Sequence, residues 1–226
     1  MGHDAHDQMA ALAKFALAQV RPHHTIGLGT GRAASAFINA LGHSLIAVRG
    51  VPTSRASEEL ARALGIEIVS LVAAPKIDLD FDGADEVDPR LNLIKGNGGA
   101  LVREKIVAAA SRKVIILVGE EKLVRKLGAR GRLPVEVVPF AVPLAARKVA
   151  ALGLKPALRR IDGVDFVTDN GNLILDCAVK EIHNPARLDR DLLSIPGVVG
   201  TGIFAAMAQM VIVAMKSGEI KTLRPR

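Results

Sequence analysis

Three segments of the chain combine residue types that could do chemistry. The first, at positions 27–32, reads Gly-Leu-Gly-Thr-Gly-Arg. Glycines let the backbone approach an anion closely, and a helix that begins after them offers free N–H groups and the positive end of its dipole. The spacing is not the G-x-G-x-x-G of dinucleotide-binding loops, and the acidic residue expected about 20 positions later is missing. The segment therefore indicates a small phosphate site, with a plain tight turn or nicotinamide binding as alternatives.

The second segment, at positions 78–89, is rich in aspartate. Asp82 is expected at the carboxyl end of a strand, where open α/β sheets bind ligands. Gly83 permits a sharp turn, so that Asp85, which follows Ala84, can return to the same crevice. Sequential acids of this kind can also bind Mg²⁺, and they can form a solvated acidic loop. A ligand site, a metal site and a surface loop all remain open from this segment alone.

The third segment places Lys95 directly before a loop of Gly96, Asn97 and Gly98, and a helix is expected to begin there. An ammonium and free backbone N–H groups in one place can hold an oxyanion. Helical side chains lean toward the helix N-terminus, so Glu104 can lean back toward the loop. The alternative is a surface glutamate paired with a neighbouring Arg or Lys. Taken together, the three segments suit proton abstraction next to a carbonyl group.

The elements that must position these segments alternate between strands and helices. Apolar spacing predicts helices at 7–20, 33–41, 55–64 and 99–110, and strands at 25–29, 44–51, 67–71, 79–81 and 113–118. The strands are nearly all apolar, which is typical of a parallel sheet covered on both faces. We therefore expect an α/β fold with a Rossmann-like parallel sheet domain.

The pattern changes near Leu133. Strands are predicted at 135–138, 156–161, 173–179 and 198–204, helices at 141–152 and 185–193, and a hairpin-type turn at 169–172. The order β-α-β-β-α-β is that of a smaller, ferredoxin-like α+β domain. A last helix is expected at 205–215, returning to the first domain. The predicted domains are residues 1–131 plus 205–226, and residues 132–204.

Composition restricts the partners and the compartment. The 226 residues carry a net charge of +7, which suits anionic partners, and half of them are hydrophobic. Six Phe without Tyr or Trp argue against a base-stacking nucleic-acid site, and the basic residues between Lys122 and Arg132 fit a solvated face. No apolar run reaches the length of a membrane span, and residues 1–7 do not resemble a secretory signal. The single cysteine, Cys177, fits a cytoplasmic protein.

Several motifs in order along the chain resemble those of the type A ribose-5-phosphate isomerase family. They lie at 27–31, 82–86, 93–96, 98–100, 103–106, 133–137, 168–172 and 195–199. The resemblance implies interconversion of D-ribose 5-phosphate and D-ribulose 5-phosphate in the pentose phosphate pathway. It also implies no cofactor, no required metal, and a homo-oligomer that is a dimer or a pair of dimers. No nucleic-acid or membrane partner is expected.

The resemblance also implies roles for individual residues. Glu104 would move a proton between C1 and C2 through an enediolate, and Lys95 with nearby N–H groups would stabilise the negative oxygen. Asp82 and Asp85 would hold sugar hydroxyls and assist ring opening. The substrate-binding residues would further include Thr30, Gly31, Arg32, Ala33, Gly83, Ala84, Gly96, Asn97, Gly98 and Lys122.

The chain departs from the family pattern at the phosphate loop. The family's usual Gly-Thr-Gly-Ser-Thr is here Gly-Thr-Gly-Arg-Ala at 29–33, and no lysine precedes Lys14 in the first helix. Asn97 replaces a usual glycine, and Gly-Thr-Gly at 200–202 replaces a Glu-Asn-Gly type stretch. We expect Arg32 to supply the phosphate affinity that the family draws from the loop hydroxyls and from a lysine early in the first helix. An isomerase of another phosphorylated aldose and a non-catalytic sugar-phosphate-binding protein are the alternative functions.

Overall fold

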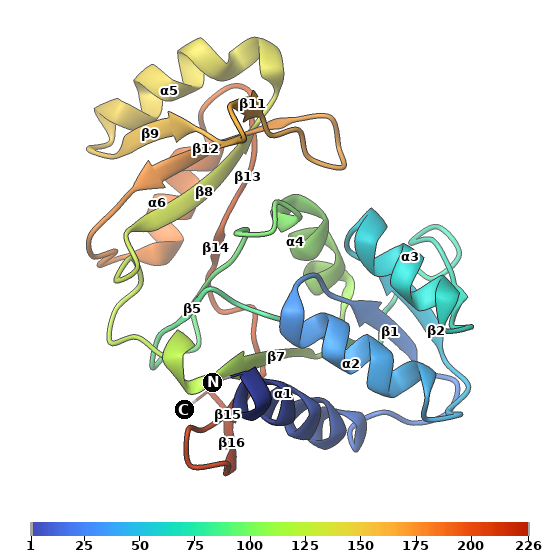
Figure 1. The fold of residues 1–226 in the computed structure, drawn as a ribbon. Helices are drawn as coiled ribbons and strands as arrows, with labels where there is room; N and C mark the ends of the chain where they lie inside the picture. The colour runs from blue at the N-terminus through green and yellow to red at the C-terminus, as the bar shows by residue number, and fades with distance from the viewer. Residues whose placement is uncertain (1, 226) are drawn as a thin grey trace.

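The computed structural model describes residues 2–225, except for the side chains of residues 2–7. Strands and helices alternate through the first half of the chain, as predicted (Figure 1). These elements are α1 (Gly2–Leu17), β1 (Thr25–Leu28), α2 (Arg32–Gly42), β2 (Arg49–Pro52), α3 (Arg55–Ala63), β3 (Glu67–Ile68), β4 (Leu79–Asp82), α4 (Leu101–Ala110) and β7 (Val114–Gly119). The strand predicted at 44–51 begins later, at Arg49, and the strand predicted at 67–71 is shorter and ends at Ile68.

The described residues form a seven-stranded main sheet in the order β16-β15-β7-β4-β1-β2-β3. All neighbours are parallel except β15 (Met210–Ala214) and β16 (Ile220–Leu223), which pair antiparallel. Helices α1, α2 and α3 pack in one hydrophobic cluster with one face of the sheet, for example through Leu12, Phe37 and Ala61. Helix α4 packs through Val107 and Ala108 with the other clusters. Coverage of both faces explains why β7 and β15 are apolar and buried along their whole length.

The helix predicted at 205–215 is wrong, although the predicted return to the first domain is correct. This segment forms β15, which lies parallel to β7 and is buried along its whole length. Val211, Ile212 and Val213 are consecutive β-branched residues, whose side chains favour a strand. A short, fully buried strand and a buried helix share a continuous apolar pattern, so periodicity alone could not separate them.

The second half of the chain forms a smaller antiparallel sheet in the order β13-β8-β12-β9. Its elements are β8 (Arg132–Val137), α5 (Val142–Ala151), β9 (Lys155–Leu158), β12 (Leu173–Ala178), α6 (Pro185–Leu193) and β13 (Val198–Thr201). The β-α-β-β-α-β order confirms the ferredoxin-like prediction. Cys177 is buried in its core with Leu133, Val135 and Leu192. A short hairpin, β10 (Arg160–Ile161) and β11 (Val164–Asp165), precedes the turn at Thr168–Asn172.

A third, short sheet links the two larger ones. It has the order β14-β6-β5, from β5 (Glu86–Val87), β6 (Leu93–Ile94) and β14 (Ile203–Phe204). Figure 1 shows β14 between the small sheet above and the main sheet below. Two 3₁₀ turns, η1 (Glu120–Lys122) and η2 (Pro139–Ala141), complete the elements of the described chain. Within that part of the chain, every helix is too short or too polar to cross a bilayer.

Candidate active site

A cavity of about 270 Å³ opens beyond the carboxyl ends of β1, β4 and β7. Ligands bind in this position in open α/β sheets. The cavity joins segments from the three candidate motifs and from the turn after β7. Its lining comprises Thr30, Gly31, Arg32, Ala33, Gly83, Ala84, Asp85, Lys95, Gly96, Asn97, Gly98, Glu104, Leu117, Val118 and Lys122. Every substrate-binding residue predicted from the sequence lines this cavity, except Asp82, which is buried beside it.

The glycine loop after β1 forms one wall of the cavity and leads into α2. Gly29 lies so close to β4 that a Cβ there would collide with the carboxylate of Asp82. Gly31 has a φ of 101°, which favours glycine, and α2 begins at Arg32 without a side-chain cap. The first N–H groups of α2 are therefore available to an anion at the cavity edge.

The hydroxyl of Thr30 is held beneath this loop. Its Oγ1 lies 2.8 Å from Thr53 Oγ1 and 2.8 Å from Ser54 Oγ, and Ser57 Oγ is 3.3 Å away. Ser54 also caps the N-terminus of α3. The hydroxyl cluster fixes the loop, so the groups left to face a phosphate here are backbone N–H groups and the exposed side chain of Arg32.

Asp82 and Lys95 form a buried ion pair at the centre of the site. Lys95 Nζ lies 2.9 Å from Asp82 Oδ2 and donates to the carbonyl oxygen of Gly83 at 2.6 Å. Asp82 Oδ1 accepts from the N–H groups of Thr30 at 3.1 Å and Gly83 at 2.7 Å. Burial disfavours the Lys95 ammonium, but the carboxylates of Asp82 and Glu104 outweigh it, so its pKa lies above the usual value. Lys95 is therefore a fixed positive charge.

Glu104 reaches the same ammonium from the first turn of α4. Its Oε2 lies 3.4 Å from Lys95 Nζ, and its side chain is only 5% exposed, so the surface alternative does not hold. Burial, followed by repulsion from Asp82, raises the pKa of Glu104 to about 8, although Lys95 acts in the opposite direction. A carboxyl group whose pKa lies near neutrality can both take and return a proton.

Asp85 and the loop after Lys95 close the other side of the cavity. Asp85 Oδ2 accepts from the N–H of Asn97 at 2.9 Å, and the N–H of Asp85 donates to Ile94 at 2.7 Å. Gly96 has a φ of 104° and Gly99 a φ of 83°, conformations that favour glycine. The loop thus bends around the cavity with Asp85 as its anchor.

Sequence reasoning missed Asp80, which lies below the ion pair on β4. Asp80 is 1% exposed, and its Oδ1 has no hydrogen-bond partner among the residues that the structure describes. Burial, together with the charge of Asp82, holds its pKa well above the usual range, and Lys95 offsets this only in part. The sequence does contain a sign of Asp80, because residues two apart on a strand face the same side and Asp82 is a predicted site residue.

The basic residues between Lys122 and Arg132 separate in the structure. Lys122, on η1, lines the cavity, whereas Lys126 pairs with Glu181 at 2.8 Å on the surface. Arg132 lies 3.7 Å from Asp176 in the small sheet. The run is therefore a solvated face with one member directed to the site. Among the side chains that the structure describes, those of residues 8–225, no group of three or more His, Cys, Asp or Glu is placed to hold a metal ion.

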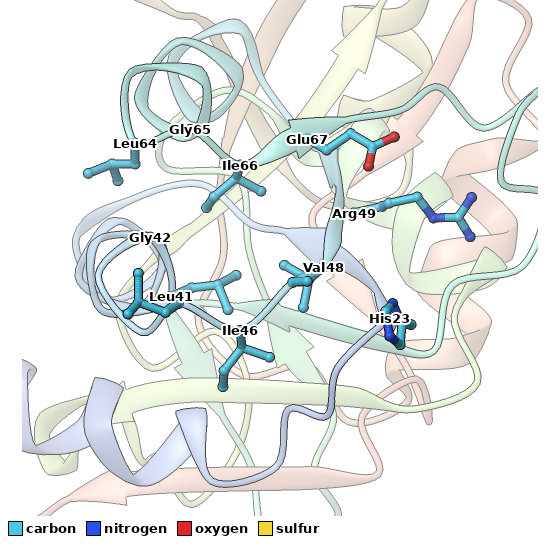
Figure 2. A pocket seen from close by; sticks show the side chains of 12 residues that line it. His23, Leu41, Gly42, Ile46, Val48, Arg49, Leu64, Gly65, Ile66 and Glu67 are labelled. Carbon is cyan, nitrogen blue, oxygen red and sulfur yellow. The ribbon is translucent and has the colours of Figure 1, made fainter.

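A larger cavity, of about 640 Å³, lies at the opposite ends of the strands, where β1, β2 and β3 begin. Figure 2 shows aliphatic side chains on its wall, including Ile46, Val48 and Ile66, with Arg49 and Glu67 at its side. The amino ends of parallel strands are not where such sheets bind ligands. We therefore assign the chemistry to the smaller, charged cavity.

Comparison with known proteins identifies the family of the chain. The family model described as ribose 5-phosphate isomerase A (phosphoriboisomerase A) matches residues 49–218. The ribose-5-phosphate isomerase A of Roseiflexus sp. (strain RS-1) is 47% identical over 219 residues, which cover 94% of each chain.

Two solved structures are also similar. The ribose 5-phosphate isomerase A of Methanocaldococcus jannaschii superposes with a TM-score of 0.91 at 39% identity, covering 96% of this chain and 98% of that one. A D-ribose-5-phosphate isomerase solved in complex with phospho-erythronic acid gives a TM-score of 0.93 at 41% identity, covering 96% and 97%. The chain therefore belongs to the ribose 5-phosphate isomerase A family and is a ribose-5-phosphate isomerase of the pentose phosphate pathway.

Proposed function

We propose that Glu104 is the base that moves the proton between C2 and C1 of the open-chain sugar phosphate. Its ionised carboxylate takes the proton from C2 of the aldose. The C2–H bonding electrons form the C1–C2 double bond, and the π electrons of the C1 carbonyl move to O1 to give an enediolate. The proton on O2 passes to O1, and Glu104 returns its own proton to C1 to give the ketose. The observation that carries this proposal is the burial of Glu104 at 3.4 Å from the Lys95 ammonium.

Lys95 and the following loop stabilise the negative oxygen of the enediolate. The ammonium of Lys95 is fixed by Asp82 and by the Gly83 carbonyl, so it needs no reorganisation when charge develops. Backbone N–H groups of the loop at Gly96 and Gly98 supplement it, while the N–H of Asn97 is bonded to Asp85. Asp82 and Asp85 hold sugar hydroxyls and assist the opening of the ring, and no metal or other cofactor takes part.

The phosphate group binds at the opposite end of the cavity. The first N–H groups of α2, with Gly31, Arg32, Ala33 and Lys122, hold it there, next to Thr30, Gly83 and Ala84, which line the cavity. The complex of a relative with phospho-erythronic acid, a phosphorylated molecule, supports a sugar phosphate as the occupant.

Substitution of Glu104 by Gln tests the proposal. The amide keeps the size of the side chain but cannot accept the proton, so kcat falls by about 10²–10⁴ while the sugar phosphate still binds. The measurement is kcat by steady-state assay, with binding of the sugar phosphate followed by calorimetry. A loss of less than roughly tenfold would assign the proton transfer to another group.

The division into two domains and the assembly state complete the proposal. Residues 1–131 plus 205–226 supply all strands of the main sheet, which supports their grouping, and residues 132–204 supply the small sheet.

The small domain exposes large apolar side chains, including Phe140 at 97% and Val164 at 71%, which supports a homo-oligomer. Sedimentation equilibrium distinguishes a dimer from a pair of dimers. A cytoplasmic location remains a prediction from the sequence.

A further inference from the structure

The loop that follows Lys95 is held from outside by the small sheet. Arg159, directly after β9, is 7% exposed and reaches across to this loop. Its Nη1 donates to the carbonyl oxygens of Gly96 at 3.0 Å and Asn97 at 3.1 Å. A side chain of the small domain is thereby bonded to the backbone that lines the active site.

The guanidinium of Arg159 is itself fixed. Its Nε donates to Asp176 Oδ2 at 2.9 Å and its Nη2 to Asp176 Oδ1 at 2.6 Å, which is the paired geometry that arginine forms with a carboxylate. The ring of Phe166 lies 5.6 Å from its central carbon. Phe166 also packs against Gly99, where a Cβ would collide with the ring. The donor that holds the loop is therefore rigid.

The hydrogen bonds from Arg159 to the Gly96 and Asn97 carbonyls set the direction of the N–H groups of the next residues, Asn97 and Gly98. In a planar trans peptide the C=O and the N–H point in opposite directions. When the Gly96 carbonyl faces Arg159, the N–H of Asn97 faces away, and it donates to Asp85 at 2.9 Å. When the Asn97 carbonyl faces Arg159, the N–H of Gly98 faces away from it as well. Gly98 lines the cavity, and its N–H has no acceptor among the described residues.

We propose that Arg159 is a positioning residue for catalysis, which fixes the peptide groups of the loop so that the Gly98 N–H faces the developing oxyanion and Asn97 anchors Asp85. This inference rests on the proposed function, in which the loop stabilises the enediolate. A lysine could not replace Arg159, because one ammonium cannot present parallel donors to the carboxylate and a further donor to two carbonyls. The small domain thus takes part in the reaction without touching the substrate.

The test is Arg159→Lys, with Arg160→Lys as the matched control. Arg160 is the next residue, is exposed, and pairs with Asp165 at 2.8 Å away from the loop. Displacement of oxyanion donors costs about 10–100-fold in rate, so Arg159→Lys lowers kcat by that factor with little change in KM. Arg160→Lys keeps the kcat of the unmodified protein. An unchanged kcat in Arg159→Lys overturns the inference.

A second variant separates positioning from stability. In Arg159→Met with Asp176→Leu the buried guanidinium and its partly buried partner carboxylate are both removed, and replacement of a buried ion pair by apolar residues often leaves stability unchanged. We expect the double variant to unfold at a temperature similar to that of the unmodified protein and to have a low kcat. Recovery of full kcat in the double variant overturns the inference, because the pair would then serve folding only. Glu104→Gln, assayed in parallel, reports on the proposed base independently of Arg159.

Discussion

The two ends of the active-site cavity are built in different ways. At the proposed catalytic end, the side chains of Asp82, Lys95 and Glu104 are each at most 5% exposed and are held by one another and by backbone groups. At the phosphate end, Gly31 and Arg32 are exposed, and the binding groups are N–H groups at the start of α2. The proposed catalytic end therefore depends on buried charge, whereas the proposed phosphate end depends on backbone shape and on the cations of Arg32 and Lys122. Substitutions at the catalytic end should alter kcat and its pH dependence, whereas substitutions at the phosphate end should alter KM.

The largest effect that separates the two ends is expected from Arg32→Ala. Hydrogen bonds to a charged group contribute about 1.5–3 kcal/mol, so the loss of one such bond raises KM for ribose 5-phosphate by roughly 10–150-fold. The phosphate is bound alike in the ground and transition states, so kcat changes little. Steady-state kinetics on ribose 5-phosphate and on ribose measure the difference. If KM is unchanged, the α2 N–H groups and Lys122 suffice, and a loss of kcat alone would place Arg32 in the chemistry.

The pH dependence of the reaction probes the catalytic end. A base must be ionised to take a proton, and the pKa of Glu104 is raised to about 8. In the free enzyme, kcat/KM therefore falls about tenfold for each pH unit below that value, or about 100-fold at pH 6. Rate measurements between pH 5.5 and pH 9 at constant ionic strength test this, with about 0.15 M salt to limit effects on surface charges. A flat profile from pH 6 to pH 8 would contradict the assignment.

A smaller effect is expected below the catalytic end, at Asp80. Its carboxyl pKa is raised, so the fold favours the neutral form, and stability is lost as the pH rises above the range of the unfolded chain. Asp80→Val keeps the branched shape beside Val107 and removes the buried charge. We expect the free energy of unfolding to rise by about 1–3 kcal/mol at pH 8, with a smaller gain at pH 4. Denaturant unfolding at both pH values measures it, and an equal change at both would show that the charge is not the cause.

Removal of metal ions is expected to leave the activity unchanged. Lys95 already supplies the positive charge next to Asp82 and Glu104, so the enediolate does not need a dication. Activity should survive dialysis against excess EDTA, checked by metal analysis of the dialysed protein. Loss of turnover that Mg²⁺ or Mn²⁺ restores would show that the aspartate segment holds a metal, which was the alternative left open by its sequence.

The sequence by itself determined the family and both sheet types, and it predicted the residues that the proposal places at the catalytic end. Glu104 and Lys95 stood out because a lysine, a glycine-rich loop and a carboxylate early in a helix form a local pattern. Helix and strand periodicity likewise predicted the alternating first half, because it depends on neighbouring residues only. The arrangement of the small sheet followed from the order of its elements.

Only the tertiary structure decided how distant segments meet. Residues 205–215 have an apolar pattern that suits a helix as well as a strand, and pairing with β7 selected the strand. Arg159 is separated from Gly96 by 63 positions, and no local pattern connects them. The burial that raises the pKa of Asp80 and Glu104 arises from packing between β4 and α4, which the sequence does not express. The strand pairing, the Arg159 contact and the raised pKa values all depend on contacts between segments that are distant in the sequence, and only the three-dimensional arrangement of the elements brings those segments together.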